Sequence, residues 1–373
     1  MIQPLLKVLI TADAVGGVWQ YSLDLARGLG DLGVEVVLAL LGPPPSERQL
    51  AEAEGVPGLK LLETGLALDW LAEDATAIRA AGASIARLAR RHAVDLVQLN
   101  SPALAAETDF PVPVVAVQHS CVATWWEAVH GTQLPEDFAW RTELVRAGLE
   151  RAQAVVTPTS AFGEATRRCY GLREAPRTVY NGRKPLPLPR RAQHDFAFTA
   201  GRLWDEGKNL STLDASAAQI SVPVRAAGPV RGPNGAAVMF ENLHCLGSLG
   251  EDELARWLAA KPVFVSAALY EPFGLAVLEA AAAGCPLILS DIPTFRELWD
   301  GVAFFVAPRD ERGFAVAIAN LVHDDFEREM MGKAAKDRAS RFTPEAMAAQ
   351  MAAIYRSLLP AVQRPVLAAR AAA

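Results

Sequence analysis

The sequence predicts an α/β protein with two doubly wound domains that face a cleft between them. Three observations support this fold class. The chain has 373 residues, short apolar runs alternate with amphipathic stretches, and a proline-rich stretch interrupts the alternation near the middle. This length favours two domains, at about 100–200 residues each. Strands alternating with helices form parallel sheets, which bind ligands beyond the carboxyl ends of their strands. The expected site is therefore the cleft.

The first domain is expected over residues 1–185. Runs rich in Val, Ile and Leu predict its strands, and amphipathic periodicity predicts its helices. The strands are expected at 7–11, 34–41, 60–62, 95–99, 112–117 and 154–157, and the helices at 18–29, 70–92 and 138–151. Residues 184–191 then hold three prolines and three basic side chains, which suit a semi-rigid linker.

The second domain is expected over residues 192–343, where the same alternation resumes. Its strands are expected at 196–199, 222–226, 243–246, 263–266, 287–290 and 303–306, and its helices at 210–220, 251–260, 274–283, 295–299 and 312–323. A last helix at 344–359 belongs to a segment, 344–373, that is expected to cross back to the first domain and end in a tail.

Composition and charge exclude several classes of function. The chain has 36 Lys and Arg against 42 Asp and Glu, a formal net charge of −6. This balance argues against a nucleic-acid-binding protein and against docking on anionic membrane. No apolar run is long enough to span a bilayer, and residues 1–4 do not begin a signal peptide. The four cysteines form no Cys-x-x-Cys pair, which is typical of reduced thiols. We therefore expect a cytoplasmic protein.

Two glycine clusters in the first domain have different interpretations. Gly28, Gly30 and Gly33 match G-x-G-x-x-G, but they close a predicted helix, whereas the dinucleotide motif opens one. We interpret them as a helix end. Gly16 and Gly17 instead follow the first strand and open the first helix, where backbone N–H groups attract anions.

The second domain concentrates charged residues at the carboxyl ends of its predicted strands. Arg202 and Lys208 follow the strand at 196–199, and together could hold a diphosphate without metal. Glu271 precedes a predicted helix, and Glu279 lies about two turns inside it. A carboxylate suits the vicinal diol of a ribose, and an unpaired charge in this apolar helix would be costly. Both points favour a ligand role for Glu279.

These residues resemble a known family, the retaining GT-B glycosyltransferases of family 4. The segment from Glu271 to Glu279 matches the E-x7-E pattern of that family. The other matching positions follow in the family's order along most of the chain: Gly16-Gly17, His119, Thr159-Ser160, Asn181-Gly182, Gly201-Arg202, Lys208-Asn209, Gly228, Leu246-Gly247 and Tyr270 to Leu275.

The resemblance implies two Rossmann-like domains and transfer of a sugar from a nucleotide-sugar donor, most often UDP- or GDP-linked, to a hydroxyl acceptor. It implies no cofactor and no bound metal. The position matching His119 lies beside the donor sugar. Other matching positions bind the donor, and they divide by role: Arg202, Lys208, Gly16 and Gly17 for the diphosphate, Glu279 for the ribose, and Glu271 with the backbone of Phe273, Gly274 and Leu275 for the sugar.

The chain departs from the family pattern at three places. Val15 stands where glycogen and starch synthases carry Lys. This difference argues against an α-glucan synthase. Ser120 replaces a frequent acidic residue after His119. Arg183 and Lys184 follow Asn181-Gly182 where an aliphatic residue is commoner, so the hinge is unusual.

The acceptor site is expected at the segment that follows His119. Trp125, Trp126 and His130 lie there, and aromatic faces stack on the C–H faces of sugars. Packing of both tryptophans against the core is an equally good interpretation. Three other functions stay open: a sugar-nucleotide epimerase, a sucrose-type synthase, and a non-catalytic subunit that binds a nucleotide sugar.

Overall fold

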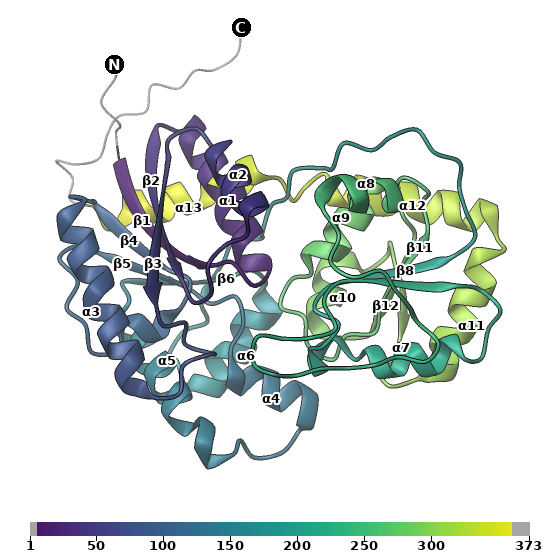
Figure 1. Ribbon diagram of the computed structural model, residues 1–373, viewed down its shortest axis with the longest axis horizontal. Helices are drawn as coiled ribbons and strands as arrows, with labels where there is room; N and C mark the ends of the chain where they lie inside the picture. The colour runs from purple at the N-terminus through teal and green to yellow at the C-terminus, as the bar shows by residue number, and fades with distance from the viewer. Residues whose placement is uncertain (1–5, 360–373) are drawn as a thin grey trace, which may run out of the picture. The chain divides into compact units, whose positions relative to one another are not determined.

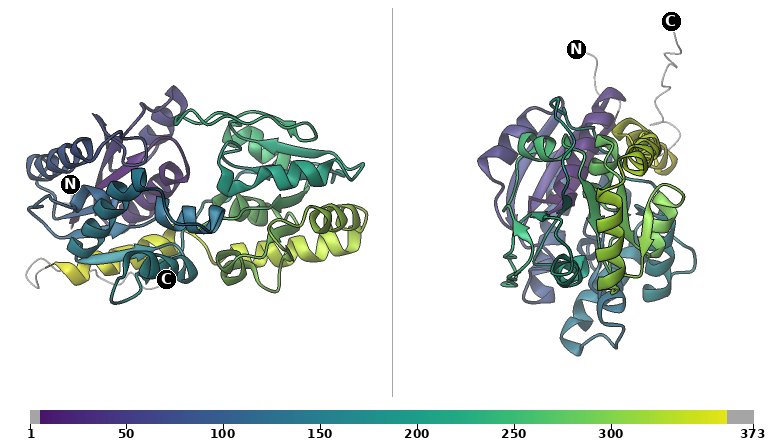
Figure 2. Two further views of the ribbon diagram at one scale, coloured as in Figure 1. Left: turned by 90° about the horizontal axis from the view of Figure 1, so that it is seen from below. Right: turned by 90° about the vertical axis from the view of Figure 1, so that its right-hand side faces the viewer.

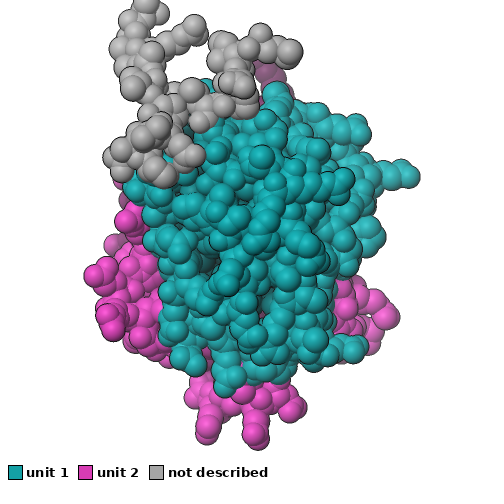
Figure 3. All heavy atoms as spheres, turned by 90° about the vertical axis from the view of Figure 1, so that its left-hand side faces the viewer, with its two compact units in different colours: residues 1–118, 140–156, 344–373 teal, residues 119–139, 157–343 magenta. Residues whose placement is uncertain are grey.

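The computed structural model describes residues 6–359 of the chain. It divides into two compact units, coloured teal and magenta in Figure 3. Unit 1 comprises residues 1–118, 140–156 and 344–373, and unit 2 comprises residues 119–139 and 157–343. The predicted first domain, 1–185, thus contains two segments that pack in unit 2, because their helices make their contacts there. The predicted tail, at the end of the segment 344–373, lies outside the described residues.

Unit 1 is built on a parallel sheet in the order β3-β2-β1-β4-β5-β6. Its strands are β1 (Leu6–Asp13), β2 (Val34–Leu41), β3 (Leu59–Leu66), β4 (Leu96–Leu99), β5 (Val114–Val117) and β6 (Ala154–Thr157). The inner strands are continuous apolar runs, as expected of a sheet covered on both faces. Val8, Leu9 and Ile10 of β1 are fully buried.

The helices of unit 1 are α1 (Gly17–Asp31), α2 (Glu47–Glu54), α3 (Ala75–Arg91), α5 (Ala139–Arg151) and α13 (Pro344–Leu358), with the short helix η1 (Pro102–Ala105). The last helix, α13, packs against α1 although more than 300 residues separate them (Figure 1). Gly28 makes this approach possible, since a Cβ there would lie 2.7 Å from Ala348 Cβ and 2.9 Å from the Pro344 carbonyl oxygen. Gly28 and Gly30 lie inside α1, so the helix-end interpretation of the glycine motif is confirmed.

Unit 2 is built on a parallel sheet in the order β10-β9-β8-β11-β12-β13. These strands are β8 (Ala197–Ala200), β9 (Val224–Ala227), β10 (His244–Cys245), β11 (Val263–Ser266), β12 (Leu287–Ser290) and β13 (Phe304–Val306). The remaining elements of the unit are α4 (Val122–His130), η2 (Glu136–Phe138), α6 (Ser160–Tyr170), β7 (Arg177–Thr178), η3 (Glu206–Lys208), α7 (Leu210–Ala217), α8 (Glu251–Leu258), α9 (Leu275–Ala283), α10 (Pro293–Trp299), α11 (Glu311–Val322) and α12 (Asp325–Ala339).

Helices cover both faces of the unit 2 sheet (Figures 1 and 2). On one face, Phe198 and Phe264 pack against Val277 and Leu278 of α9. On the other face, side chains of β9, β11 and β12 pack against α7 and against Phe314 of α11. The two apolar layers fix the sheet in the middle of the unit and leave the strand ends for polar residues.

The structure adds elements that the sequence pattern did not predict, among them α2, α4, α6 and α12. The helix expected at 70–92 begins only at Ala75, because the Asp74 side chain accepts a hydrogen bond from the Ala77 amide at 3.0 Å and caps it there. No helix within residues 6–359 combines the length and hydropathy needed to cross a membrane.

Candidate functional site

A small cavity lies at the carboxyl ends of β8 and β11 in unit 2. Gly201, Lys208, Ser266, Glu271 and Val277 are among the residues that line it. It therefore joins the loop after β8 to the start of α9, the two places where the sequence predicted ligand contacts. Parallel sheets bind ligands at this edge.

The loop after β8 carries Arg202 in a fixed position. The Arg202 Nη2 donates to Asp205 Oδ2 at 2.8 Å, and its guanidinium carbon lies 5.5 Å from the centre of the Trp204 ring. Asp205 also accepts from the Gly207 amide at 2.9 Å. An arginine held by a carboxylate and an aromatic face is ready to meet an anion without first losing side-chain freedom.

Lys208 lies opposite Glu271, and their side chains form an ion pair. Both side chains are largely buried, at 18% and 17% exposure. Asn209, the next residue, adopts φ of +54°, and its Nδ2 donates to the carbonyl oxygens of Ala267 at 2.9 Å and Pro308 at 2.7 Å. These two bonds hold the loop, so Lys208 enters the cavity from a rigid turn.

The start of α9 offers backbone N–H groups. Gly274 has φ of +89°, which favours glycine, and a Cβ there would lie 3.2 Å from the Phe295 ring. The Phe273 side chain is buried in the core at 5.7 Å from the Phe342 ring. Phe273, Gly274 and Leu275 can therefore contact a ligand through their backbone. The Glu271 carbonyl accepts from Thr294 Oγ1 at 2.7 Å, which holds the approach to the helix.

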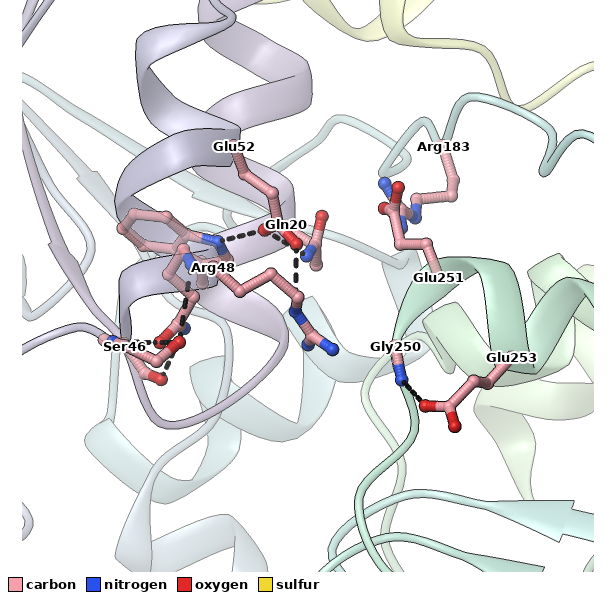
Figure 4. Close-up of polar contacts among 11 residues, drawn as sticks. Gln20, Ser46, Arg48, Glu52, Arg183, Gly250, Glu251 and Glu253 are labelled. Atoms are coloured by element: carbon pink, nitrogen blue, oxygen red, sulfur yellow. Dashed lines mark hydrogen bonds and ion pairs between the residues drawn. The ribbon is translucent and has the colours of Figure 1, made fainter.

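Glu279 of α9 is paired with a residue that sequence reasoning did not connect to it. Arg183 Nε donates to Glu279 Oε1 at 2.7 Å, and Arg183 Nη2 donates to Glu251 Oε1, also at 2.7 Å. Figure 4 shows Arg183 and Glu251 facing each other, near the Gly250 amide that Glu253 caps. The sequence offered one signal, the unexpected Arg after Asn181-Gly182, but no sign of its partner 96 residues away.

His119 follows β5 and begins the 119–139 segment of unit 2. Loss of hydration in its half-buried position lowers the pKa of His119 to about 3. The imidazole is therefore neutral at physiological pH, with one ring nitrogen able to donate and the other able to accept.

Tyr270 connects this segment to the α9 approach. Its hydroxyl accepts from the Cys121 amide at 3.2 Å and lies 2.9 Å from Thr124 Oγ1. The Trp125 Nε1 donates to Asp205 Oδ1 at 3.1 Å, so Trp125 touches the same carboxylate as Arg202. Sequence reasoning missed Asp205, and it used Tyr270 only as part of a motif.

Trp126 and His130 lie together on α4. Their ring centres are 4.1 Å apart, and the Phe138 ring lies 5.7 Å from that of Trp126. The Trp126 Nε1 donates to Thr132 Oγ1 at 3.2 Å. All three predicted acceptor residues thus lie on α4, and Trp125, whose ring centre is 5.3 Å from that of His130, also donates to Asp205 of the loop after β8.

Gly16 and Gly17 lie in unit 1, at the start of α1. Gly16 is the N-cap and Gly17 the first helical residue, and no side chain caps this end. The loop before them is shaped by Asp13 Oδ1, which accepts from the Val15 amide at 2.9 Å. In α1, which follows this loop, Trp19 and Gln20 donate to Glu52 of α2. Glu52 also pairs with Arg48 (Figure 4).

A larger hollow of about 700 Å³ also opens in unit 2, beside α12. Its lining includes Asp195, Lys261 and Pro286, which precede β8, β11 and β12, so it lies at the amino ends of the strands. Buried Arg328 already donates there to Asp195 at 2.8 Å and to the His194 carbonyl at 3.0 Å. We interpret this hollow as a structural junction. Across residues 6–359, no three His, Cys, Asp or Glu side chains are grouped to hold a metal ion.

Two family descriptions match the chain. Glycosyltransferase Family 4 matches residues 15–185, and Glycosyl transferases group 1 matches residues 239–338. Among curated relatives, a glycogen synthase of Mycobacterium tuberculosis is 36% identical over 115 residues, which are 30% of this chain and 27% of that protein. A D-inositol 3-phosphate glycosyltransferase of Kribbella flavida is 36% identical over 106 residues, which are 28% of this chain and 25% of that protein. The chain therefore spans about a quarter of the length of these relatives.

Solved structures match the fold over nearly the whole chain. Sucrose-phosphate synthase from Thermosynechococcus elongatus aligns with a TM-score of 0.77 and 20% identity, covering 95% of this chain and 99% of that one. HepE of Anabaena, in complex with UDP and glucose, aligns with a TM-score of 0.71 and 19% identity, covering 95% and 100%. These likenesses confirm the predicted fold class, two Rossmann-like domains of the GT-B type.

Proposed function

Because this chain belongs to the family-4 GT-B glycosyltransferases, we propose that it transfers a sugar from a nucleoside diphosphate sugar to an acceptor hydroxyl, with retention at the anomeric carbon. One observation carries the proposal: Lys208 and Glu271 pair in the cavity at the carboxyl ends of β8 and β11, with Arg202 on the loop that carries Lys208 and Glu279 on the helix that follows Glu271. Anions and sugar hydroxyls are the ligands that such a set of side chains recognises.

In this proposal the donor diphosphate is held by Arg202 and Lys208. Arginine offers a planar fork of donors and lysine a compact positive charge. Asp205 and Glu271 hold the two cations in place, and each cation has further N–H groups for phosphate oxygens.

The rest of the donor is assigned to α9 and its approach. Glu279 accepts the two ribose hydroxyls, and Glu271 with the backbone from Phe273 to Leu275 contacts the sugar. During transfer the bond from the anomeric carbon to the diphosphate oxygen breaks, and the acceptor oxygen bonds on the same face. The acceptor proton goes to the leaving diphosphate, whose charge Arg202 and Lys208 neutralise. Neutral His119 lies beside the sugar and offers a hydrogen bond.

This mechanism uses neither a metal ion nor a cofactor, and the nucleotide sugar, UDP- or GDP-linked, is a co-substrate. We assign the acceptor to the aromatic cluster of Trp126 and His130 on α4, with Trp125 at its border, where it donates to Asp205 of the loop after β8. A cytoplasmic location without a nucleic-acid partner remains part of the proposal, and membrane contact, though open, is not expected.

Thermal unfolding with UDP, GDP and ADP and their sugar conjugates, with and without EDTA, tests the donor site. A ligand that binds only the folded state at about 100 times its Kd adds about 2.7 kcal/mol of stability. We expect a shift for one nucleotide that EDTA leaves unchanged and that Glu279→Gln weakens. Lys333→Met, an exposed lysine of α12, is the control.

Turnover then separates the possible activities. Incubation with an acceptor panel, followed by NMR of the product linkage, is expected to show retention. Interconversion of sugar nucleotides without acceptor would identify an epimerase, and binding without any turnover would identify a non-catalytic subunit. No shift with any nucleotide would exclude the proposed donor site.

A further inference from the structure

Arg183 immediately precedes the linker, yet both its backbone and its side chain make specific contacts. It follows Asn181-Gly182, and its backbone amide donates to the Phe342 carbonyl at 3.1 Å. Its side chain is only 5% exposed. By contrast Arg191, eight residues later in the linker, is exposed and donates to the Arg256 carbonyl at 2.9 Å. The side chain of Arg183 is therefore directed into unit 2. Burial of its charged guanidinium group requires partners there.

The guanidinium group of Arg183 contacts two carboxylates from different helices. Its Nε edge faces Glu279 of α9, and its Nη2 faces Glu251 at the start of α8, each at 2.7 Å. The Glu279 side chain is 11% exposed and that of Glu251 is 44% exposed. The three side chains form a row from a half-exposed acid through a buried arginine to a buried acid.

Glu279 needs this arginine for two physical reasons. Its neighbours on α9, Val277, Leu278, Ala280 and Ala281, are buried and apolar, and a carboxylate among them is costly without an opposite charge. A glutamate side chain also has several rotatable bonds, whose freedom would be lost when a ligand binds. A charge-assisted bond to Oε1 holds one orientation before any ligand arrives.

The pairing is compatible with a further ligand on the same carboxylate. An ionised carboxylate has about four acceptor sites on its two oxygens. A carboxylate that accepts from Arg183 can therefore also accept from a pair of hydroxyls. Glu251 accepts from a second nitrogen of the guanidinium group, so Arg183 has an anchor that does not depend on Glu279.

We propose that Arg183, anchored by Glu251, is a positioning residue that sets the Glu279 carboxylate to receive the vicinal hydroxyls of the donor ribose. The inference rests on the proposed function, since it takes Glu279 as the ribose contact. It assigns selectivity for ribose over 2′-deoxyribose to a three-residue row, of which only Glu279 belongs to the family pattern.

The experiment measures Kd by calorimetry for UDP and 2′-deoxy-UDP, and for the corresponding GDP and ADP pairs. In the wild-type protein we expect at least about tenfold preference for the ribose form, the effect of one lost bond to a charged group. Arg183→Leu is expected to reduce this preference to about threefold or less. Glu251→Gln should reduce it less, because the bond from Arg183 to Glu279 remains, and Arg191→Leu should leave it unchanged.

A double-mutant cycle distinguishes positioning from general stability. If Arg183 acts through Glu279, Arg183→Leu should not change the ribose preference any further in the Glu279→Gln background. An independent loss in that background would overturn the proposal. If Arg183→Leu does not fold, Arg183→Lys and Glu251→Gln carry the test, since both keep a charge or a hydrogen-bonding group at the row.

The outcomes distinguish failure of the proposed function from failure of the role of Arg183. If the wild-type protein binds no nucleoside diphosphate, the proposed function fails. If it binds one with ribose preference and Arg183→Leu keeps that preference, only the role of Arg183 fails. Tighter binding of the ribose form by Arg183→Leu would show that Arg183 competes with the hydroxyls, and would likewise overturn the inference.

Discussion

The first strand-to-helix connections of the two units occupy the same place in similar sheets but carry different chemistry. In unit 1, β1 leads to α1 through Asp13-Ala-Val-Gly16, a short turn without a cationic side chain. In unit 2, β8 leads to α7 through a longer loop that holds Arg202, Asp205 and Lys208. The fold supplies a strand end in both units, and the side chains placed there decide what it can bind.

Removing the charge from the unit 2 connection should have the largest effect. Lys208→Met keeps much of the side-chain length and leaves Glu271 without its cation. We expect kcat/KM to fall about 10²- to 10³-fold, the loss typical of one group that stabilises developing negative charge. Steady-state kinetics with the donor identified by thermal shift would measure it. Lys333→Met should stay near wild type, and equal losses in both variants would contradict the assignment.

Crowding unit 1 at its helix pair should change stability but leave nucleotide binding by unit 2 intact. In Gly28→Ala the new Cβ meets the backbone of Pro344 and the side chain of Ala348. We expect a loss of about 1–3 kcal/mol in unfolding free energy, measured by chemical denaturation. Gly30→Ala is the matched control in the same helix, because its nearest contact, the Pro57 carbonyl oxygen, lies at 3.3 Å. A nucleotide Kd altered in Gly28→Ala would show that the two regions are not separable.

The two tryptophans of α4 allow a finer comparison within unit 2. Trp125→Phe removes the N–H that donates to Asp205, so we expect a several-fold rise in donor KM. Trp126→Ala removes a ring from the cluster with His130 and should raise acceptor KM several-fold without affecting donor KM. If each variant changes both constants equally, the division between donor and acceptor roles is wrong.

The smallest expected effect is a pH dependence at His119. Its pKa is about 3 in the folded state and 6.5 in the reference state, so between these values the unfolded chain binds more protons. Stability should therefore fall as pH is lowered from 6.5 towards 3. Denaturation midpoints of His119→Gln should decline less steeply over this window than those of the wild type. Parallel curves would show that His119 titrates normally.

Much of the fold could be predicted because its strands are continuous apolar runs. The strands at 34–41, 154–157, 263–266 and 287–290 were predicted with the bounds that the structure has. Helix α4 was not predicted, since its Trp-Trp pair, Val122 and Thr124 are modest helix formers and no side chain caps its start. Helix α12 has a largely polar surface, and its buried positions include Arg328 and Gly332, which an apolar pattern does not reveal.

The candidate site was predictable where chemistry is local in sequence. Arg202 and Lys208 share one loop, and Glu271 and Glu279 share one helix and its approach, so residue type and spacing pointed to them. Arg183 meets Glu279 only through the tertiary structure, and no spacing rule connects residues 96 positions apart. Ion pairs between residues so far apart in the chain can be identified only in the three-dimensional structure.

The packing of α13 on α1 has a consequence for protein synthesis. Residues 344–358 cover a face of α1 that is made more than 300 residues earlier. During translation that face of α1 stays uncovered until all of unit 2 has emerged from the ribosome, because α13 follows unit 2 in the chain. We expect unit 2 to become resistant to protease first and unit 1 to close last, an order that pulse proteolysis of stalled nascent chains would record. Until then the exposed side of α1 is a surface to which a chaperone can bind.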